Sequence, residues 1–286
     1  KLVANAFNLD FESNIIDDIE IINDNQSITL DPGWHMFGVP LSLYDNFSEN
    51  LFPATNVDDW VIFNSEGDFN EIDIDFRKGY YLALNNTEEL YASGSPIISS
   101  NIEESDISLS AGWNLFSYPL FTSYEKYDIT VSHLGNTYEW YEAVNRALIS
   151  PTIYSWEDNQ YISALELNPW GAYWINASSD NITIHFRESL NQEARYGSED
   201  YNIKLFATTN DSDVSFDQID ISYADSYSED FIYGEDEFNL ESHIMPNFID
   251  MYLDKREWIG TTDINGVISE TSRFSHIRSL KDAETK

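Results

Sequence analysis

Two groups of residues in this 286-residue chain could bind a ligand: acidic residues near the C-terminus and aromatic residues that follow a glycine. The acidic candidates stand in TNDSDVSFDQID and YSEDFIYGEDEFN, and they are Asp211, Asp213, Asp230 and Asp236. Calcium takes about six to eight oxygen ligands, which acidic loops of a β-sandwich can supply. Neither stretch has the glycine and glutamate positions of an EF-hand loop, so calcium is a candidate cofactor without a diagnostic motif. In a chain with 51 Asp and Glu, solvated loops are the alternative interpretation.

The aromatic candidates lie in RKGYYLALN and PWGAYWINA, and they are Tyr80, Trp170, Tyr173 and Trp174. An exposed row of such rings could stack on the faces of sugar rings. Because successive residues of a strand point to opposite faces, only one subset could do so. The alternative is that the rings fill the core of a small module, where no ligand would reach them.

Catalytic motifs are missing from the sequence. It contains no G-x-S-x-G, H-E-x-x-H, P-loop or G-x-G-x-x-G pattern, and its five histidines are scattered. The absence of cysteine excludes disulfides and thiolate chemistry. Carboxylate pairs of the glycosidase type come together only in three dimensions, so spacing does not test them. We therefore expect a non-catalytic protein without a cofactor, and calcium is the one candidate for a bound metal.

Composition limits the partners. A hydrophobic fraction of 42% indicates a folded chain, and a net charge of −37 repels nucleic acid and anionic lipid headgroups. The longest apolar runs are too short to span a bilayer. We expect neither nucleic-acid binding nor membrane insertion. The expected partners are other domains of the same polypeptide or a surface assembly, with glycans as a further candidate.

An internal repeat indicates the architecture. SITLDPGWHMFGVPL and DISLSAGWNLFSYPL both read as strand, tight turn and strand, which predicts two hairpins. Gly33 and Gly112 would supply a positive φ in the turn, and Trp34 and Trp113 would pack their rings against the sheet.

A second glycine, Gly79 in the first copy and Gly171 in the second, precedes an alternating aromatic strand in each repeat. The spacing to this glycine is 46 residues (33 to 79) in the first copy and 59 (112 to 171) in the second. The difference fits a short inserted helix within 135–151, where apolar residues recur at helical spacing and Pro151 ends the pattern.

These patterns predict an all-β chain of tandem modules. Residues 1–26 are a linker or the end of a preceding domain, 27–104 the first repeat, 105–198 the second repeat with its inserted helix, and 199–286 a C-terminal β-sandwich. Each repeat is expected to fold around an independent core. Because the chain starts at Lys1 without a signal segment, we expect a mature or excised part of a larger protein.

The segments GWHMFGVPL, GWNLFSYPL, KGYYL and WGAYWI resemble the GWNLIS-type β modules of large secreted bacterial surface proteins. The similarity extends over about residues 27–270. In that family such modules precede sorting domains of the type IX secretion system, which implies an extracellular or cell-surface location. The family occurs with many different partner domains, so the resemblance implies architecture more than activity.

The sequence therefore favours a structural or adhesive module of a larger secreted or surface protein. Two alternatives stay open: a carbohydrate-binding module that uses exposed aromatic rings, and an accessory region of a secreted hydrolase.

Overall fold

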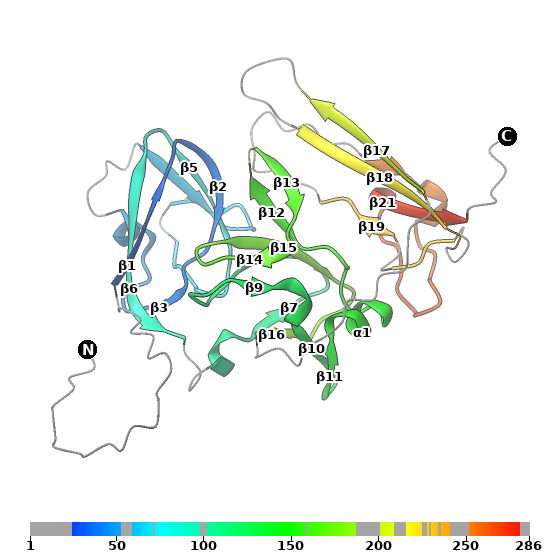
Figure 1. Ribbon diagram of the computed structural model, residues 1–286, viewed down its shortest axis with the longest axis horizontal. Helices are drawn as coiled ribbons and strands as arrows, with labels where there is room; N and C mark the ends of the chain where they lie inside the picture. Colours follow the sequence, from blue (N-terminus) through cyan, green and yellow to red (C-terminus); the bar gives the residue numbers. More distant parts are fainter. Residues whose placement is uncertain are drawn as a thin grey trace, which may run out of the picture.

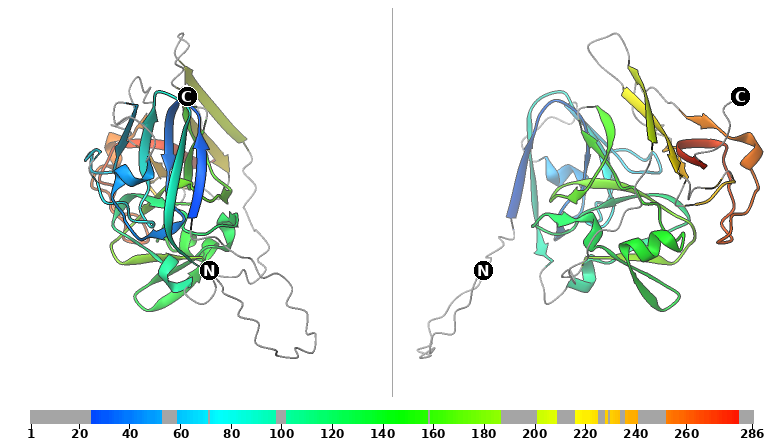
Figure 2. Two further views of the ribbon diagram at one scale, coloured as in Figure 1. Left: turned by 90° about the vertical axis from the view of Figure 1, so that its left-hand side faces the viewer. Right: turned by 45° about the vertical axis from the view of Figure 1, so that its right-hand side comes forward.

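The computed structural model describes residues 25–52, 59–70, 72–97, 102–157, 159–186, 201–208, 216–224, 228, 230–233, 236–240 and 252–280. The chain is all-β, as the sequence predicts, and its described part contains one α-helix. Figure 1 shows three successive groups of strands, with the green strands of the second repeat between the blue strands and the yellow to red ones. The right-hand view of Figure 2 shows the same order.

The first repeat is a pair of three-stranded sheets. One has the order β1-β6-β3 and the other β2-β5-β4. The bounds are β1 (Asn25–Leu30), β2 (Gly33–Phe37), β3 (Leu41–Leu43), β4 (Trp60–Phe63), β5 (Tyr80–Leu84) and β6 (Glu88–Pro96), with a 3-10 turn at Ser48–Leu51. The inward residues of both sheets, such as Leu41, Ile62, Leu82 and Leu90, are fully buried and form the core of this repeat.

The second repeat has two four-stranded sheets, β11-β10-β16-β7 and β13-β12-β15-β8. The bounds are β7 (Ile107–Leu109), β8 (Gly112–Ser117), β10 (Thr130–His133), β11 (Asn136–Glu139), β12 (Tyr154–Glu157), β13 (Gln160–Ser163), β15 (Ala172–Ala177) and β16 (Ile182–His185). A short ladder joins β9 (Tyr124–Glu125) to β14 (Glu166–Leu167). Without the added hairpin strands β11 and β13, the strand orders correspond to those of the first repeat.

The Gly-Trp turn differs from the predicted hairpin. The strands on either side do not pair with each other: β1 pairs with β6, whereas β2 pairs with β5 in the other sheet. The same holds for β7 and β8 in the second repeat. Each turn is therefore an arch that carries the chain from one sheet to the other. Gly33 and Gly112 have φ of 131° and 91°, a region of backbone conformation that side chains disfavour.

The strand register corrects the alignment of the second glycine. The equivalent ladder pairs are Phe37 with Tyr80 and Phe116 with Tyr173. The structural counterpart of Gly79 is therefore Ala172, one residue after Gly171. The match of Gly79 with Gly171 was wrong because both positions lie at the start of an aromatic strand, where a shift of one residue leaves the composition similar.

The predicted insertion contains α1 (Trp140–Asn145), with Trp140 and Ala143 buried in the core of the second repeat. The helix is shorter than the sequence pattern suggested, because residues 136–139 pair with β10 as strand β11. Two 3-10 turns precede the insertion, at Ile102–Ser105 and Lys126–Asp128.

The described residues after 200 form one mixed sheet of order β17-β18-β21-β19, with β20 also paired to β21. The bounds are β17 (Tyr201–Thr208), β18 (Phe216–Ala224), β19 (Glu237–Phe238), β20 (Leu253–Asp254) and β21 (Arg273–Leu280), and a 3-10 turn spans Arg256–Trp258. Phe231, Trp258 and Phe274 form its aromatic core. Ala147 of the second repeat belongs to the same cluster. Within the described ranges, no helix has the length and apolarity to cross a membrane.

Candidate functional site

The four aromatic rings predicted as an exposed sugar-stacking row are buried. The exposed fractions are 2% for Tyr80, 9% for Trp170, 3% for Tyr173 and 8% for Trp174. The strand alternation sends Tyr80 and Tyr173 into the cores of their own repeats. The two hydroxyls accept hydrogen bonds from backbone N–H groups, and burial raises the pKa of each to about 12. These four residues therefore do not form an exposed row. The burial rules out the alternative of a sugar-stacking surface and agrees with the interpretation of the rings as core residues.

Trp170 makes a contact that the sequence did not predict. It belongs to the second repeat, yet its ring packs in the core cluster of the first. Its backbone has φ of 65°, which is unfavourable for a large L-residue. The residue is therefore held by its surroundings, and it anchors one repeat in the other.

The two repeats face each other through an approximate two-fold relation. The Gly38 N–H donates to the Trp170 carbonyl at 2.9 Å, and the Ser117 N–H donates to the Arg77 carbonyl at 3.1 Å. By the ladder registers, Gly38 corresponds to Ser117 and Arg77 corresponds to Trp170. The two bonds are the same contact made once by each repeat, which is the defining property of an isologous interface.

Small residues allow the close approach at the centre of this interface. A Cβ atom added to Gly38 would lie 1.9 Å from the Ser117 Oγ, and one added to Gly79 would lie 2.7 Å from the Ala172 Cβ. Each pair consists of structurally equivalent residues that meet each other, as expected at a two-fold axis. Gly79 therefore has a packing role that its place in the sequence motif did not reveal.

Residues of both repeats also share an apolar cluster, to which the C-terminal segment adds Leu240. It contains Met36, Tyr81, Leu115, Ala172, Trp174 and Leu240. The Trp174 Nε1–H donates to the Tyr81 hydroxyl at 2.8 Å, and that hydroxyl lies 2.7 Å from the Tyr161 hydroxyl. Each repeat has its own core, but this third cluster shows that the two are not independent.

The tryptophans of the Gly-Trp motif pack at the edges of the shared cluster. The Trp34 ring stacks on Phe63 with centroids 5.8 Å apart, and the Trp113 ring meets Tyr154 edge-on at 5.9 Å. The registers make these contacts equivalent. The motif tryptophans therefore support the interface more than the individual cores.

The predicted calcium ligands do not form a site within the described residues. Asp211 and Asp213 lie outside those residues. Asp230 is exposed, whereas Asp236 is buried and its Oδ2 accepts a hydrogen bond from the Ile232 N–H at 2.9 Å. Across the described ranges no group of three or more His, Asp and Glu is arranged to hold a metal ion. The structure therefore gives Asp236 a loop-stabilising contact.

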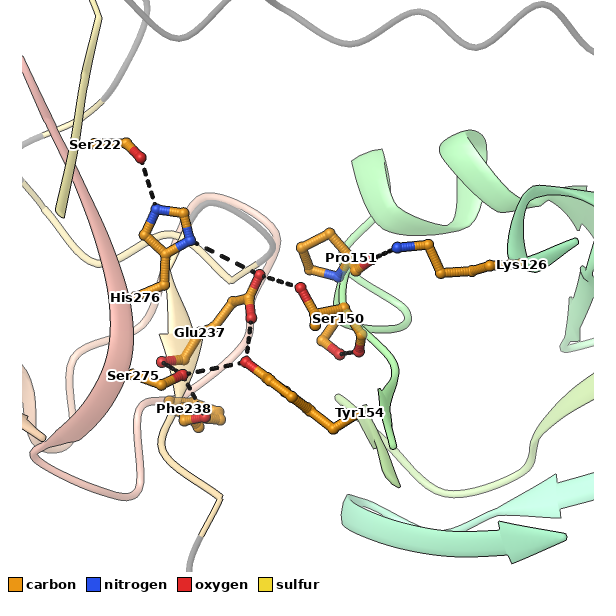
Figure 3. A network of polar contacts seen from close by, with 10 residues as sticks. Lys126, Ser150, Pro151, Tyr154, Ser222, Glu237, Phe238, Ser275 and His276 are labelled. Atoms are coloured by element: carbon orange, nitrogen blue, oxygen red, sulfur yellow. Dashed lines mark hydrogen bonds and ion pairs between the residues drawn. The ribbon is translucent and has the colours of Figure 1, made fainter. Parts of the chain in front are cut away.

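A buried polar network joins the second repeat to the C-terminal segment (Figure 3). The Glu237 carboxylate on β19 accepts hydrogen bonds from the Thr152 hydroxyl at 2.8 Å and the Tyr154 hydroxyl at 2.9 Å. The same carboxylate lies 4.0 Å from the His276 Nδ1, and the His276 Nε2 lies 2.8 Å from the Ser222 Oγ. Because Glu237 is 5% exposed, these contacts replace the water that its charge would otherwise have.

Lys126 lies on the second-repeat side of this network (Figure 3). Its ammonium group donates to the Pro151 carbonyl at 3.1 Å and lies over the Tyr127 and Trp140 rings. Burial lowers the pKa of Lys126 to about 8, and the negative charge of Glu237 partly opposes that shift. The second repeat thus holds, close to this interface, a buried cation whose pKa is well below that of an ordinary lysine.

In two places a histidine lies between a serine and an acidic residue, an arrangement that resembles the catalytic triad of a hydrolase. One set is the network of Ser222, His276 and Glu237. In the other, the His185 ring nitrogens lie 2.8 Å from the Ser132 Oγ and 2.9 Å from Asp106. Both serines stand in central strands that are paired on both sides, so the neighbouring N–H groups are engaged in ladders and do not form an oxyanion hole. We interpret both sets as side-chain links between strands.

A cavity of about 700 Å³ lies between the second repeat and the C-terminal segment. Trp113, Trp174 and Asn176 line it from β8 and β15, and Tyr233 and Phe238 line it from the C-terminal side. The Tyr233 hydroxyl donates to the Asn176 Oδ1 at 2.6 Å, and burial raises the Tyr233 pKa well above its usual value. Among the residues that the structure describes, the buried Trp113 Nε1 has no hydrogen-bond partner.

Comparison with protein-family models, with curated proteins and with solved structures found no significant match. The features that bear on function are therefore the two interfaces and the cavity. Sequence reasoning missed the cavity because its lining residues are far apart in the chain. The one sequence feature that could have indicated a binding site here is Trp113, because an indole near a strand end can present a polar N–H as well as an apolar ring.

Sequence reasoning also missed two exposed tyrosines on the first repeat. Tyr44 is 66% exposed and Tyr91 is 43% exposed, and both line a cavity of about 290 Å³. The Tyr91 hydroxyl donates to Glu89. Neither residue stands in the repeated motifs, which is why the motif comparison passed over them.

Proposed function

We propose that this chain is a non-catalytic structural segment of a larger secreted or cell-surface bacterial protein. In this role the two repeats and the C-terminal segment act as one rigid connector that holds neighbouring domains, or parts of a surface assembly, at a fixed separation and orientation. Adhesion of the larger protein would depend on that rigid display.

The observation that carries the proposal is the two-fold interface between the repeats. An isologous contact uses the same face of both partners, so it closes on itself instead of extending into a chain of further modules. Backbone hydrogen bonds in both directions and a shared apolar cluster restrict movement of one repeat against the other. The connector role follows from this restriction.

The charge and the sequence resemblance support an extracellular role. A net charge of −37 keeps a protein soluble and disfavours phosphate-rich partners such as nucleic acid and anionic membranes. Proteins built from the GWNLIS-type modules that this chain resembles are exported to the bacterial surface.

Two measurements test the proposal. Small-angle X-ray scattering of the full chain should fit one compact shape for the described segments, with no need for an ensemble of repeat orientations. In the producing bacterium, an antibody against the chain should label intact cells or the culture medium. A scattering profile that requires freely moving repeats, or a chain confined to the cytoplasm, would refute the proposal.

A further inference from the structure

We propose that the cavity between the second repeat and the C-terminal segment binds a neutral, hydroxyl-rich ligand of the saccharide class. This function goes beyond the connector role and does not depend on it. The volume of about 700 Å³ falls within the range of small-molecule sites, about 300–1,000 Å³.

The chemistry of the lining favours a saccharide. Aromatic residues line both sides of the cavity, and the apolar face of an aromatic ring packs well against the C–H groups of a sugar ring. Side-chain amides also line it, and an amide can both donate and accept hydrogen bonds, as sugar hydroxyls do. The Asn176 Oδ1 already accepts from Tyr233 and the Asn265 Nδ2 already donates to Asp263, which leaves the Asn176 amino group and the Asn265 carbonyl oxygen for a ligand. The aromatic residues are Trp113, Trp174, Tyr233 and Phe238, and the amides are Asn176, Asn239 and Asn265.

The buried indole N–H groups of Trp60 and Trp113 have no hydrogen-bond partner among the described residues, and of the two only Trp113 lines this cavity. A buried donor without an acceptor costs about 1–3 kcal/mol, so a ligand that shifts the side chains covering this N–H and supplies an oxygen to it would gain affinity. The equivalent Trp34 in the first repeat has the same edge position but does not line this cavity. The two copies of the motif therefore differ in one respect: Trp113 lines the cavity and Trp34 does not.

The charges at the cavity favour a neutral ligand. Arg146 lines it but is paired with Glu142 at 2.9 Å, and the other full charge in the lining is the exposed Glu270. His133 completes the ionisable lining. With a net charge of −37 on the chain, an anionic ligand would be repelled on approach.

The test is a titration of the full chain with soluble saccharides, followed by tryptophan fluorescence and calorimetry. The probes are glucose, galactose, mannose and N-acetylglucosamine, with their di- to tetrasaccharides. We expect at least one probe to saturate. In Trp113→Phe, which keeps the ring and removes the N–H, its affinity should fall about five- to tenfold.

Matched variants separate binding in this cavity from binding elsewhere on the chain. Trp34→Phe changes the equivalent indole outside the cavity and should leave the affinity unchanged. Asn265→Ala removes an amide from the C-terminal side and should weaken binding even if Trp113→Phe fails to fold. Replacement of both exposed tyrosines of the first repeat, Tyr44→Ser with Tyr91→Ser, should have no effect. The proposal is overturned if no probe saturates, if the two Phe variants behave alike, or if binding is lost only in the tyrosine variant.

Discussion

The two interfaces of this protein are stabilised by different kinds of interaction. The contact between the repeats is apolar, approximately symmetric and includes backbone hydrogen bonds. The contact between the second repeat and the C-terminal segment contains a buried glutamate, a histidine, a neighbouring buried lysine and a cavity. The first depends on shape and should be insensitive to pH. The second depends on charge, so pH and a bound ligand can both change its stability.

The anchoring residue of the repeat interface should show the largest effect. Trp170→Ala empties the space that its ring fills in the first-repeat core and should lower the free energy of unfolding by about 3–5 kcal/mol. Chemical denaturation monitored by circular dichroism measures this loss. Arg77→Ala changes the equivalent but exposed position and should cost less than about 0.5 kcal/mol. Equal losses in the two variants would contradict the anchoring role.

The symmetric contact at Gly38 should give a smaller but diagnostic effect. Gly38→Ala forces a methyl group against Ser117 and should destabilise the protein by about 1–3 kcal/mol. The exchanged double variant, Gly38→Ser with Ser117→Gly, places the larger side chain on the other repeat. If the two repeats are related by a true two-fold, urea denaturation should show that the double variant is nearly as stable as the wild-type protein. A loss of stability equal to the sum of the losses in Gly38→Ser alone and Ser117→Gly alone would count against the two-fold relation.

The polar interface should respond to loss of charge. Glu237→Gln keeps the shape but weakens the hydrogen bonds from Thr152 and Tyr154, at a cost of about 1–3 kcal/mol. Hydrogen exchange should rise at β12 and β19 and stay unchanged at β2 and β5. The control is Glu89→Gln, an exposed carboxylate that also accepts hydrogen bonds from two hydroxyls. A uniform rise over both interfaces would mean that they unfold as one unit.

The pH dependence should come from Lys126. Because its folded-state pKa is about 8 and its ordinary pKa is 10.5, the unfolded chain binds more protons than the folded one between these values. Stability conferred by this site therefore rises with pH across that window. Relative to Lys126→Met, the wild-type protein should gain about 1–3 kcal/mol between pH 7.5 and 10. Denaturation curves at fixed ionic strength test this, and a constant difference would exclude the proposed shift.

The sequence predicted the local structure better than the contacts between segments. The repeated Gly-Trp motif and the alternating aromatic strands indicated β structure because periodicity reports the local backbone. The pairing of β1 with β6, in place of a hairpin with β2, depends on strands about 60 residues apart, which no local pattern encodes. The burial of Trp174 could not be predicted for the same reason, because Met36 and Tyr81, which belong to the other repeat, pack in the same cluster.

Single residues at the candidate site were the hardest to predict. Glu237 looked like one acid among many in an acidic stretch, and its role depends on hydroxyls more than 80 residues earlier in the chain. The sequence indicates a structural role for Trp113, but the burial of its indole N–H without a partner depends on the side chains packed around it in the folded protein.

A distance measurement between the repeats tests the rigid two-fold connection most directly. Because the chain contains no cysteine, spin labels can be placed at Ser65→Cys and Ser108→Cys, which are exposed positions in the first and second repeats. Pulsed electron paramagnetic resonance should give one narrow distance distribution, which Gly38→Ala broadens. A broad or multiple distribution in the otherwise unmodified chain would show that the repeats move independently and would contradict the connector role.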